Sequence, residues 1–293
     1  MEYGKIKPIN MGFNYKMAAE IINCFNSDDI QAELNKLGHM QCMDADTIIS
    51  TIFNDGESNA LKPTQFTLLH HFCEQYLYHY LYNERYYFLD EICSDLEADF
   101  IIDYIDKTAR ILAEYGVPIC DYRTIIKDFD EKNIDADLSD YEYEENIRAL
   151  YDDMFQNFDL IESNIIEATF YLLYDNKGFL FKFNKFLSNY VNSIFLPEHY
   201  FDDQKHIKRC QYLPEWLKRA VFYRDNGRCQ HCGKDLSGLL AINDDALLQY
   251  DHIIPLEQAG TNDATNFQIL CRECNIQKSS KLILPKYFYQ MYW

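Results

Sequence analysis

Four cysteines in two Cys-x-x-Cys pairs stand near the end of the 293-residue sequence. Cys229 and Cys232 form the first pair, and Cys271 and Cys274 form the second. Four thiolates are the ligand set of a closed, tetrahedral structural zinc site. Residues 233–270 separate the two pairs, a longer gap than the roughly fifteen to twenty residues of an ordinary zinc ribbon. A further functional element is therefore expected between the pairs.

That interval contains an apolar run that ends in an acid, a histidine and then a proline. Residues 247–254 are typical of a strand stopped by Pro255, which places Asp251 and His252 at the end of the strand. A neutral imidazole accepts a proton near pH 7. An Asp-His pair on its own is more often structural than catalytic. Its position between two cysteine pairs favours a catalytic role here.

Two asparagines and a lysine follow. Asn266 precedes a short apolar segment that leads into an expected helix carrying the second cysteine pair. On that helix Asn275 and Lys278 are three residues apart and share a face. Strand, loop and helix would then converge, with zinc fixing the helix in place. The carboxylate of Asp251 and the amide oxygen of Asn275 would suit Mg²⁺ or Mn²⁺, so two metals with separate roles are expected.

These motifs resemble those of the HNH endonucleases, which have a ββα-metal fold and cut a nucleic-acid strand with one divalent cation. The resemblance covers about residues 212–282. It implies that His252 is the general base and that Asp251 and Asn275 bind the catalytic cation. It also implies that Asn266 orients the loop that carries the histidine.

The sequence departs from the family pattern at two places. Asn275 stands where the motif has its final histidine, and Ala259-Gly260 replaces the usual Gly-Gly of the loop. Asparagine at the metal position is a known variant of the family, so it is compatible with activity.

The resemblance implies hydrolysis of DNA phosphodiester bonds, leaving 5′-phosphate and 3′-hydroxyl ends. One active site cuts one strand, so a nick is the expected product, and RNA remains an open alternative as substrate. The basic residues beside the site are the expected phosphate contacts. They are Arg224, Arg228, Arg272, Lys278 and Lys281.

A helical region joined to such a module also resembles effector nucleases of bacterial antiphage systems, which are often encoded beside an ATPase or sensor. That likeness is at the level of fold only. The likeness implies that an ATPase or sensor subunit is a protein partner of this chain. The alternative function is a non-catalytic zinc-binding adaptor that docks on nucleic acid or on a protein.

Charge separates the chain into two parts. Residues 207–293 contain 11 Lys and Arg against 9 Asp and Glu. The whole chain has 27 Lys and Arg and 47 Asp and Glu. Residues 1–206 therefore contain 16 Lys and Arg and 38 Asp and Glu, a net charge of −22. Such a surface repels phosphate backbones, and its acidity is either that of a solvated helical face or serves to bind a partner or restrain the nuclease.

We predict a mainly α-helical chain with two domains. Residues 1–206 form an acidic helical domain whose role is partner binding, regulation or dimerisation, and residues 207–293 form the nuclease domain. Apolar periodicity predicts the helices. They are expected at about residues 15–25, 28 onward, 47–53, 63–88, 94–115, 140–155, 160–175, 179–196 and 216–222, with an acidic loop at 128–140 and a linker at 198–211.

Several other features favour ordinary packing. His70, His71 and His79 lie in an aromatic helix without matched carboxylates, so we expect them to pack rather than to bind metal. The phenylalanines between residues 179 and 186 are expected in a core. No long uncharged apolar run is present, and the first residues lack a signal-peptide pattern, so a cytoplasmic protein without a membrane partner is expected.

Overall fold

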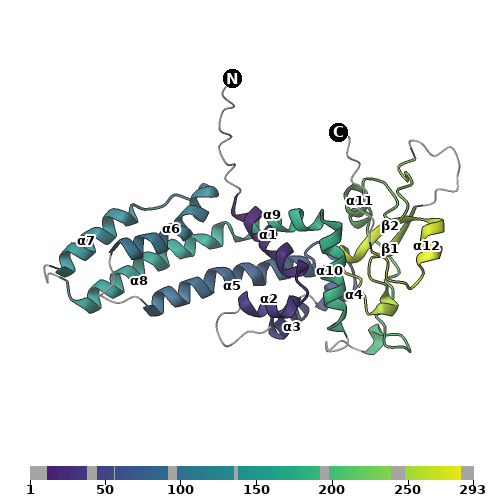
Figure 1. Cartoon of the computed structure of the whole chain (residues 1–293), viewed down its shortest axis with the longest axis horizontal. Helices are drawn as coiled ribbons and strands as arrows, with labels where there is room; N and C mark the ends of the chain where they lie inside the picture. The colour runs from purple at the N-terminus through teal and green to yellow at the C-terminus, as the bar shows by residue number, and fades with distance from the viewer. Residues whose placement is uncertain are drawn as a thin grey trace, which may run out of the picture. The chain divides into compact units, whose positions relative to one another are not determined.

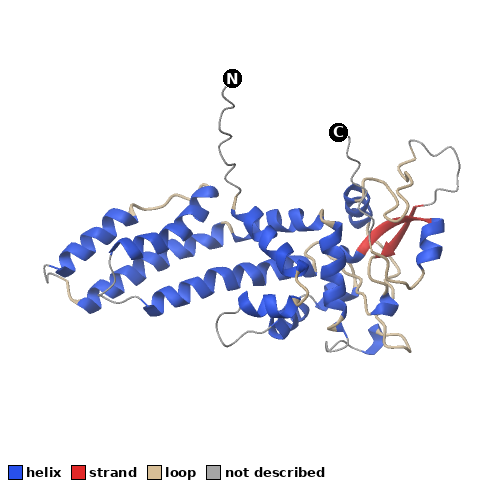
Figure 2. Cartoon of the chain, viewed as in Figure 1, coloured by secondary structure: helices blue, strands red, loops and turns tan. Residues whose placement is uncertain are grey.

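The computed structural model describes seven stretches of the chain, and the fold follows from these. They are residues 12–37, 45–55, 57–91, 98–134, 138–191, 198–238 and 248–284. Within them the chain is mainly helical, with a two-stranded antiparallel sheet near the C-terminal end (Figures 1 and 2). The predicted fold class is confirmed. No helix in these stretches is long and apolar enough to cross a membrane.

The chain divides into two compact units that do not follow the sequence in order. The first takes residues 1–19 and 77–169, and the second takes residues 20–76 and 170–293. The predicted boundary at residue 206 therefore lies inside the second unit. The boundaries between the units fall within helices, namely α1 (Phe13–Asn26), α5 (Leu68–Glu91) and α9 (Glu162–Tyr174).

The first unit packs three helices, which are α6 (Ala98–Glu114), α7 (Tyr122–Ile134) and α8 (Asp140–Gln156). Along α6, Ile101, Ile105 and Leu112 are buried, a spacing that places them on one helical face. Buried Asp106 accepts a hydrogen bond from Tyr122 Oη at 2.6 Å. This contact joins α6 to α7.

Helix α7 corrects the expected acidic loop at residues 128–140. The helix continues to Ile134. Lys132 Nζ lies 2.7 Å from Asp128 Oδ2, one turn away, and this pair offsets part of the acidic repulsion. A capping box starts α8, because Ser139 Oγ accepts from Glu142 N at 3.3 Å while Glu142 Oε2 accepts from Ser139 N at 3.1 Å.

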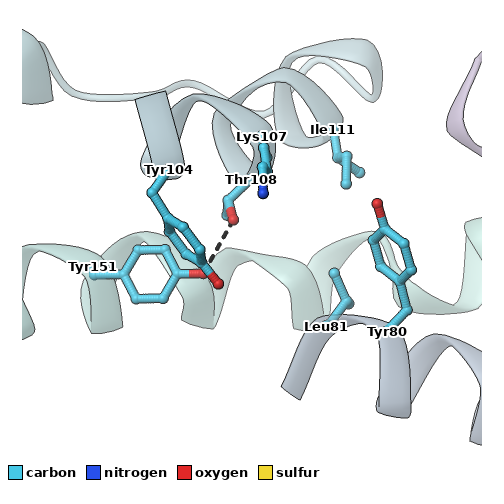
Figure 3. Close-up of a pocket in the computed structure, with 7 residues that line it drawn as sticks. All are labelled: Tyr80, Leu81, Tyr104, Lys107, Thr108, Ile111 and Tyr151. Carbon is cyan, nitrogen blue, oxygen red and sulfur yellow. Dashed lines mark hydrogen bonds between the residues drawn. The ribbon is translucent and has the colours of Figure 1, made fainter. Parts of the chain in front are cut away.

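A small cavity lies among α5, α6 and α8 in this unit (Figure 3). Its volume is about 20 Å³, about the space that one water molecule occupies. Thr108 Oγ1 and Tyr151 Oη face each other at 3.2 Å beside it. The cavity is thus too small for an organic ligand.

The second unit contains an aromatic core around Phe25. The rings of Phe72, Phe179, Phe183 and Phe186 lie edge-on to Phe25, with centroid distances of 5.2–5.8 Å. The last three come from α10 (Lys177–Ser188), so three of the four α10 phenylalanines form a core as predicted, while Phe181 is half-buried. Short helices complete this part. They are α2 (Ile30–Leu37), α3 (Ala45–Asp55) and α4 (Glu57–Leu61). In the first unit, a 3₁₀ turn, η1 (Asn157–Leu160), precedes α9.

The C-terminal part of the second unit holds the sheet. Its elements are η3 (Glu198–Tyr200), α11 (Glu215–Arg224), β1 (Leu248–His252), η4 (Leu256–Gln258), η5 (Ala264–Asn266), β2 (Phe267–Cys271) and α12 (Arg272–Lys278). Strand β2 is buried along its whole length. Its residues join Leu217 and Val221 of α11 in one apolar core. The α11 helix and the sheet thus support each other.

Candidate functional site

The antiparallel sheet aligns the two ends of the predicted site. Leu248 pairs with Cys271 and His252 pairs with Phe267. Helix α12 follows β2 directly, so its first turn begins at the end of the sheet opposite His252. The predicted order of strand, strand and helix is confirmed.

The four predicted zinc ligands lie together. The Sγ atoms of Cys229, Cys232, Cys271 and Cys274 are all within 4.8 Å of one another, and Cys232 and Cys271 are 3.8 Å apart. Zinc–sulfur bonds of about 2.3 Å in a tetrahedron give sulfur–sulfur distances of about 3.8 Å. The cluster therefore fits one zinc ion and would fix α12 to the turn at Cys229.

Asp251 and Lys278 form a buried ion pair. Lys278 Nζ lies 2.8 Å from Asp251 Oδ2, and their side chains are 3% and 10% exposed. The same ammonium group donates to the backbone carbonyl of His252 at 2.8 Å. Gln268 Nε2 is 3.4 Å from Asp251 Oδ2. Lys278 thus anchors the end of strand β1 to helix α12.

His252 has a polar partner at Nε2, and among the described residues its buried Nδ1 has none. Its Nε2 lies 3.1 Å from Asn262 Oδ1. Asn262 Nδ2 donates to two backbone carbonyls, of Leu61 and Lys208, which fixes the amide with Oδ1 toward the histidine. Because Oδ1 only accepts, Nε2 carries the proton. Nδ1 makes no hydrogen bond with any described residue.

The charge state of His252 follows from its surroundings. The side chain is 1% exposed and packs against the Phe267 ring at 4.5 Å. Burial, with the positive charge of Arg209 as the second cause, lowers the pKa of His252 to about 3. The imidazole is therefore neutral near pH 7, with its free lone pair on Nδ1.

Asn266 fixes the loop after the histidine. Its Oδ1 accepts from Ile254 N at 2.8 Å, while Nδ2 donates to Ile254 O at 3.0 Å and to Thr261 O at 2.8 Å. The side chain is fully buried. These bonds close residues 254–261 into one loop directly after the histidine.

The loop is tight where the sequence has Ala259-Gly260. A Cβ on Gly260 would lie 2.0 Å from the carbonyl oxygen of Ile254, so only glycine fits. Ala259 has φ 57°, in the left-handed region that favours glycine. The alanine thus holds a backbone conformation that glycine adopts at lower cost.

The residues expected to bind the catalytic cation come from facing elements. Asp251 is the next-to-last residue of strand β1, and half-buried Asn275 lies on α12 one turn before Lys278. By their chemistry a carboxylate and an amide oxygen suit Mg²⁺ or Mn²⁺. In this structure the Lys278 ammonium lies 2.8 Å from Asp251 Oδ2 and already neutralises the carboxylate, so a divalent cation there would share the carboxylate with Lys278 or displace the ammonium.

Two of the five expected phosphate contacts are corrected. Arg224 is 6% exposed, donates through Nε to Asp225 Oδ1 at 2.9 Å and lies over the Tyr174 ring. Asp225 also accepts from Ile269 N at 2.9 Å, so Arg224 and Asp225 connect α11 to strand β2. Lys278 is 2% exposed. Both cations neutralise buried carboxylates and do not face solvent.

The other three expected phosphate contacts remain accessible. Arg272 and Lys281 are exposed, and Arg228 is half-buried with one nitrogen 3.3 Å from Gly233 O. Arg209 joins them as an exposed cation close enough to His252 to affect its pKa. Arg209 lies in the expected linker, and the basic residues between Lys205 and Arg209 are the sequence feature that could have identified it.

His70 of α5 packs among aromatic side chains. His70 is stacked against Phe170 with a centroid distance of 3.7 Å and against Phe66 at 4.8 Å. Its Nδ1 accepts from Thr67 N at 3.0 Å. Among the described residues, the four-cysteine cluster is the one group with metal-binding spacing.

Comparison with known proteins agrees with this geometry. Residues 229–281 match the family model of the HNH endonucleases. The match starts at the first zinc-site cysteine, contains Asp251, His252, Asn266 and Asn275, and ends at Lys281. No curated protein and no solved structure matches the chain. The matched residues indicate nuclease activity in general.

Proposed function

We propose that this protein is a metal-dependent endonuclease that hydrolyses DNA phosphodiester bonds with His252 as the general base. One observation carries the proposal. Asn262 holds the proton on Nε2, so that Nδ1 of a neutral, oriented imidazole is left as a buried acceptor without a hydrogen bond at the end of strand β1. A base needs this combination of orientation and free lone pair.

The chain's other residues have separate roles in the proposed reaction. Asp251 and Asn275 would hold a Mg²⁺ or Mn²⁺ ion, which supplies neutralisation of charge on the phosphate and on the departing oxygen. His252 accepts a proton from the attacking water at Nδ1. Asn266 keeps the histidine loop in place. The zinc at the four cysteines would be structural.

A single site of this kind cuts one strand, so a nick is the proposed product, with 5′-phosphate and 3′-hydroxyl ends. We also propose, from the resemblance of the sequence to antiphage effectors, that the protein acts in bacterial defence with an ATPase or sensor partner. The net charge of −22 on residues 1–206 suits a partner with a basic face better than it suits DNA.

A second function has one observation in its favour. His252 is 1% exposed and Asp251 is 7% exposed, so a phosphate cannot touch either side chain until neighbouring groups move. A zinc-binding adaptor without catalysis needs no such opening. The adaptor therefore remains the competing proposal.

A nicking assay distinguishes the two. Supercoiled plasmid is incubated with zinc-loaded full-length protein and with Mg²⁺, Mn²⁺ or EDTA. The nuclease proposal requires open-circle DNA with one of the two cations and none with EDTA. A protein that binds DNA but leaves the plasmid supercoiled under every condition is the adaptor.

A further inference from the structure

The loop that follows the proposed catalytic histidine is bound to helices far away in the sequence. Its residues 261–266 are all buried, with exposed fractions of 0–3%. Three of its polar side chains, those of Asn262, Asp263 and Thr265, each contact a different part of the second unit outside the HNH-like segment. A nuclease module that folded independently would not need these contacts.

Asn262 joins the most distant segments. Its backbone N–H donates to Ala60 O at 2.8 Å, and its Nδ2 donates to Leu61 O at 3.0 Å, both at the end of α4. Nδ2 also donates to Lys208 O at 2.8 Å. Its Oδ1 is the acceptor for His252 Nε2. One side chain therefore links α4, the segment before α11 and the proposed base.

Asp263 caps helix α5 from outside that helix. Its Oδ2 accepts from Leu68 N, the first residue of α5, at 2.8 Å. Its Oδ1 accepts from Thr265 N at 2.8 Å and from Thr265 Oγ1 at 2.6 Å. A carboxylate at a helix N-terminus is stabilised by the unpaired N–H groups and by the helix dipole. The loop and the start of α5 are thus fixed to each other.

Thr265 makes the third connection. Asn184 Nδ2, in α10, lies 3.3 Å from Thr265 Oγ1 and 3.3 Å from Thr265 O, and both residues are buried. Asn184 Nδ2 also donates to Leu180 O at 2.9 Å within its own helix. The histidine loop is therefore held by α4, α5 and α10 together.

We propose that Asn262 is a positioning residue for His252 and that α4, the start of α5 and α10 form the scaffold of the catalytic loop. This inference rests on the proposed function. It gives residues 57–76 and 177–188 a supporting role in the reaction, in place of restraint of the nuclease. A partner that displaces α4 or the start of α5 would move Asn262 and thereby turn the imidazole.

The first test changes Asn262 directly. In Asn262→Ala the full-length protein loses the acceptor for Nε2, so His252 is no longer held in one tautomer. ¹⁵N NMR of the imidazole, assigned with His252→Ala, should show a single Nε2–H form in the wild type and a mixture of forms in the variant. The kcat for nicking should fall about 10- to 100-fold with KM nearly unchanged, the size typical of groups that orient a reactive residue.

The second test acts through the scaffold and does not depend on Asn262→Ala folding. Asp263→Asn leaves one acceptor oxygen where the carboxylate has two, so the side chain can no longer accept from Leu68 N and from Thr265 at once, and the link between the loop and α5 is weakened. The residues His252 and Asn262 themselves are not replaced. Asp29→Asn is the matched control, because exposed Asp29 Oδ1 caps α2 at 2.9 Å from Ala32 N. Asp263→Asn should lower kcat and alter the His252 ¹⁵N signals, while Asp29→Asn should leave both unchanged.

The outcomes separate this inference from the proposed function. A wild type that fails to nick contradicts the nuclease, yet the ¹⁵N signals still report whether Asp263 and Asn262 control His252. An active protein in which Asp263→Asn matches Asp29→Asn in kcat and in ¹⁵N signals would overturn the scaffold. So would a His252 tautomer that is the same in Asn262→Ala and in the wild type.

Discussion

The ammonium group of Lys278 lies 2.8 Å from the carboxylate of Asp251, and both side chains are almost fully buried. Lys278 is therefore an internal cation of the proposed site and not a contact for the DNA backbone. A buried carboxylate without a partner is costly, so this pair constrains strand β1 and helix α12 at once.

Lys278→Met should destabilise the protein. The change leaves Asp251 buried without its counterion, and removing one partner of a buried pair costs about 3–5 kcal/mol. Urea unfolding of zinc-loaded protein measures the loss. Lys281→Met is the control, because Lys281 is exposed and its removal should change the free energy of unfolding by no more than about 0.5 kcal/mol. Equal stability of the two variants would contradict the role given to Lys278.

Cys271→Ser should lose zinc and solubility together. Cys271 ends strand β2, caps α12 and supplies one of four thiolates, so its loss opens the site that joins these elements. Metal analysis of the purified protein should give one zinc per chain in the wild type and in Cys120→Ser, an exposed cysteine outside the cluster. Zinc-free wild-type protein that is folded and active would exclude the structural zinc.

Gly260→Ala and Ala259→Gly should have unequal effects. The new Cβ at residue 260 would meet the carbonyls of Ile254 and Pro255, and we expect a loss of at least about 2 kcal/mol. At residue 259, glycine removes about 1 kcal/mol of strain from the left-handed conformation of the folded state. It also raises the conformational entropy of the unfolded chain, which costs a similar free energy, so the free energy of unfolding should stay within about 1 kcal/mol of the wild-type value. Thermal unfolding measures both variants. A Gly260→Ala protein that is as stable as Ala259→Gly, or more stable, would contradict this loop geometry.

Arg272→Ala combined with Lys281→Ala should weaken DNA binding equally for all sequences. Each lost phosphate contact lowers the slope of log K against log salt by about 0.9, so the pair should lower it by about 2. Titrations at several salt concentrations measure the slope. Lys36→Ala with Lys127→Ala, two exposed lysines outside the module, should leave it unchanged. The same slope in both double variants would place the DNA elsewhere.

Much of the site was predictable because its signals are local. The cysteine spacing identified the metal cluster, and the proline after the apolar run placed Asp251 and His252 at the end of a strand. Asn266 bonds to Ile254 N and Thr261 O within the loop after the histidine, and its role in orienting the histidine stays a prediction. The capping box at Ser139 depends only on residues three apart.

What the sequence did not reveal depends on contacts between distant residues. Asn262 joins residues 60, 61, 208 and 252, and no spacing rule connects these positions. Arg224 and Lys278 looked like surface cations because the buried carboxylates that they neutralise, Asp225 and Asp251, become evident only in the fold. The division at residue 206 followed charge, whereas packing places the HNH-like segment in one unit with residues 20–76.

The central claim is that His252 is the base of a nicking reaction, and His252→Ala tests it most directly. The variant should bind DNA and retain zinc as the wild type does, while its nicking rate with Mg²⁺ or Mn²⁺ falls by about 10²- to 10⁴-fold, the contribution of a general base. His199→Ala, at an exposed position, should nick at the wild-type rate. A zinc-loaded His252→Ala protein that nicks as fast as the wild type would contradict the catalytic assignment.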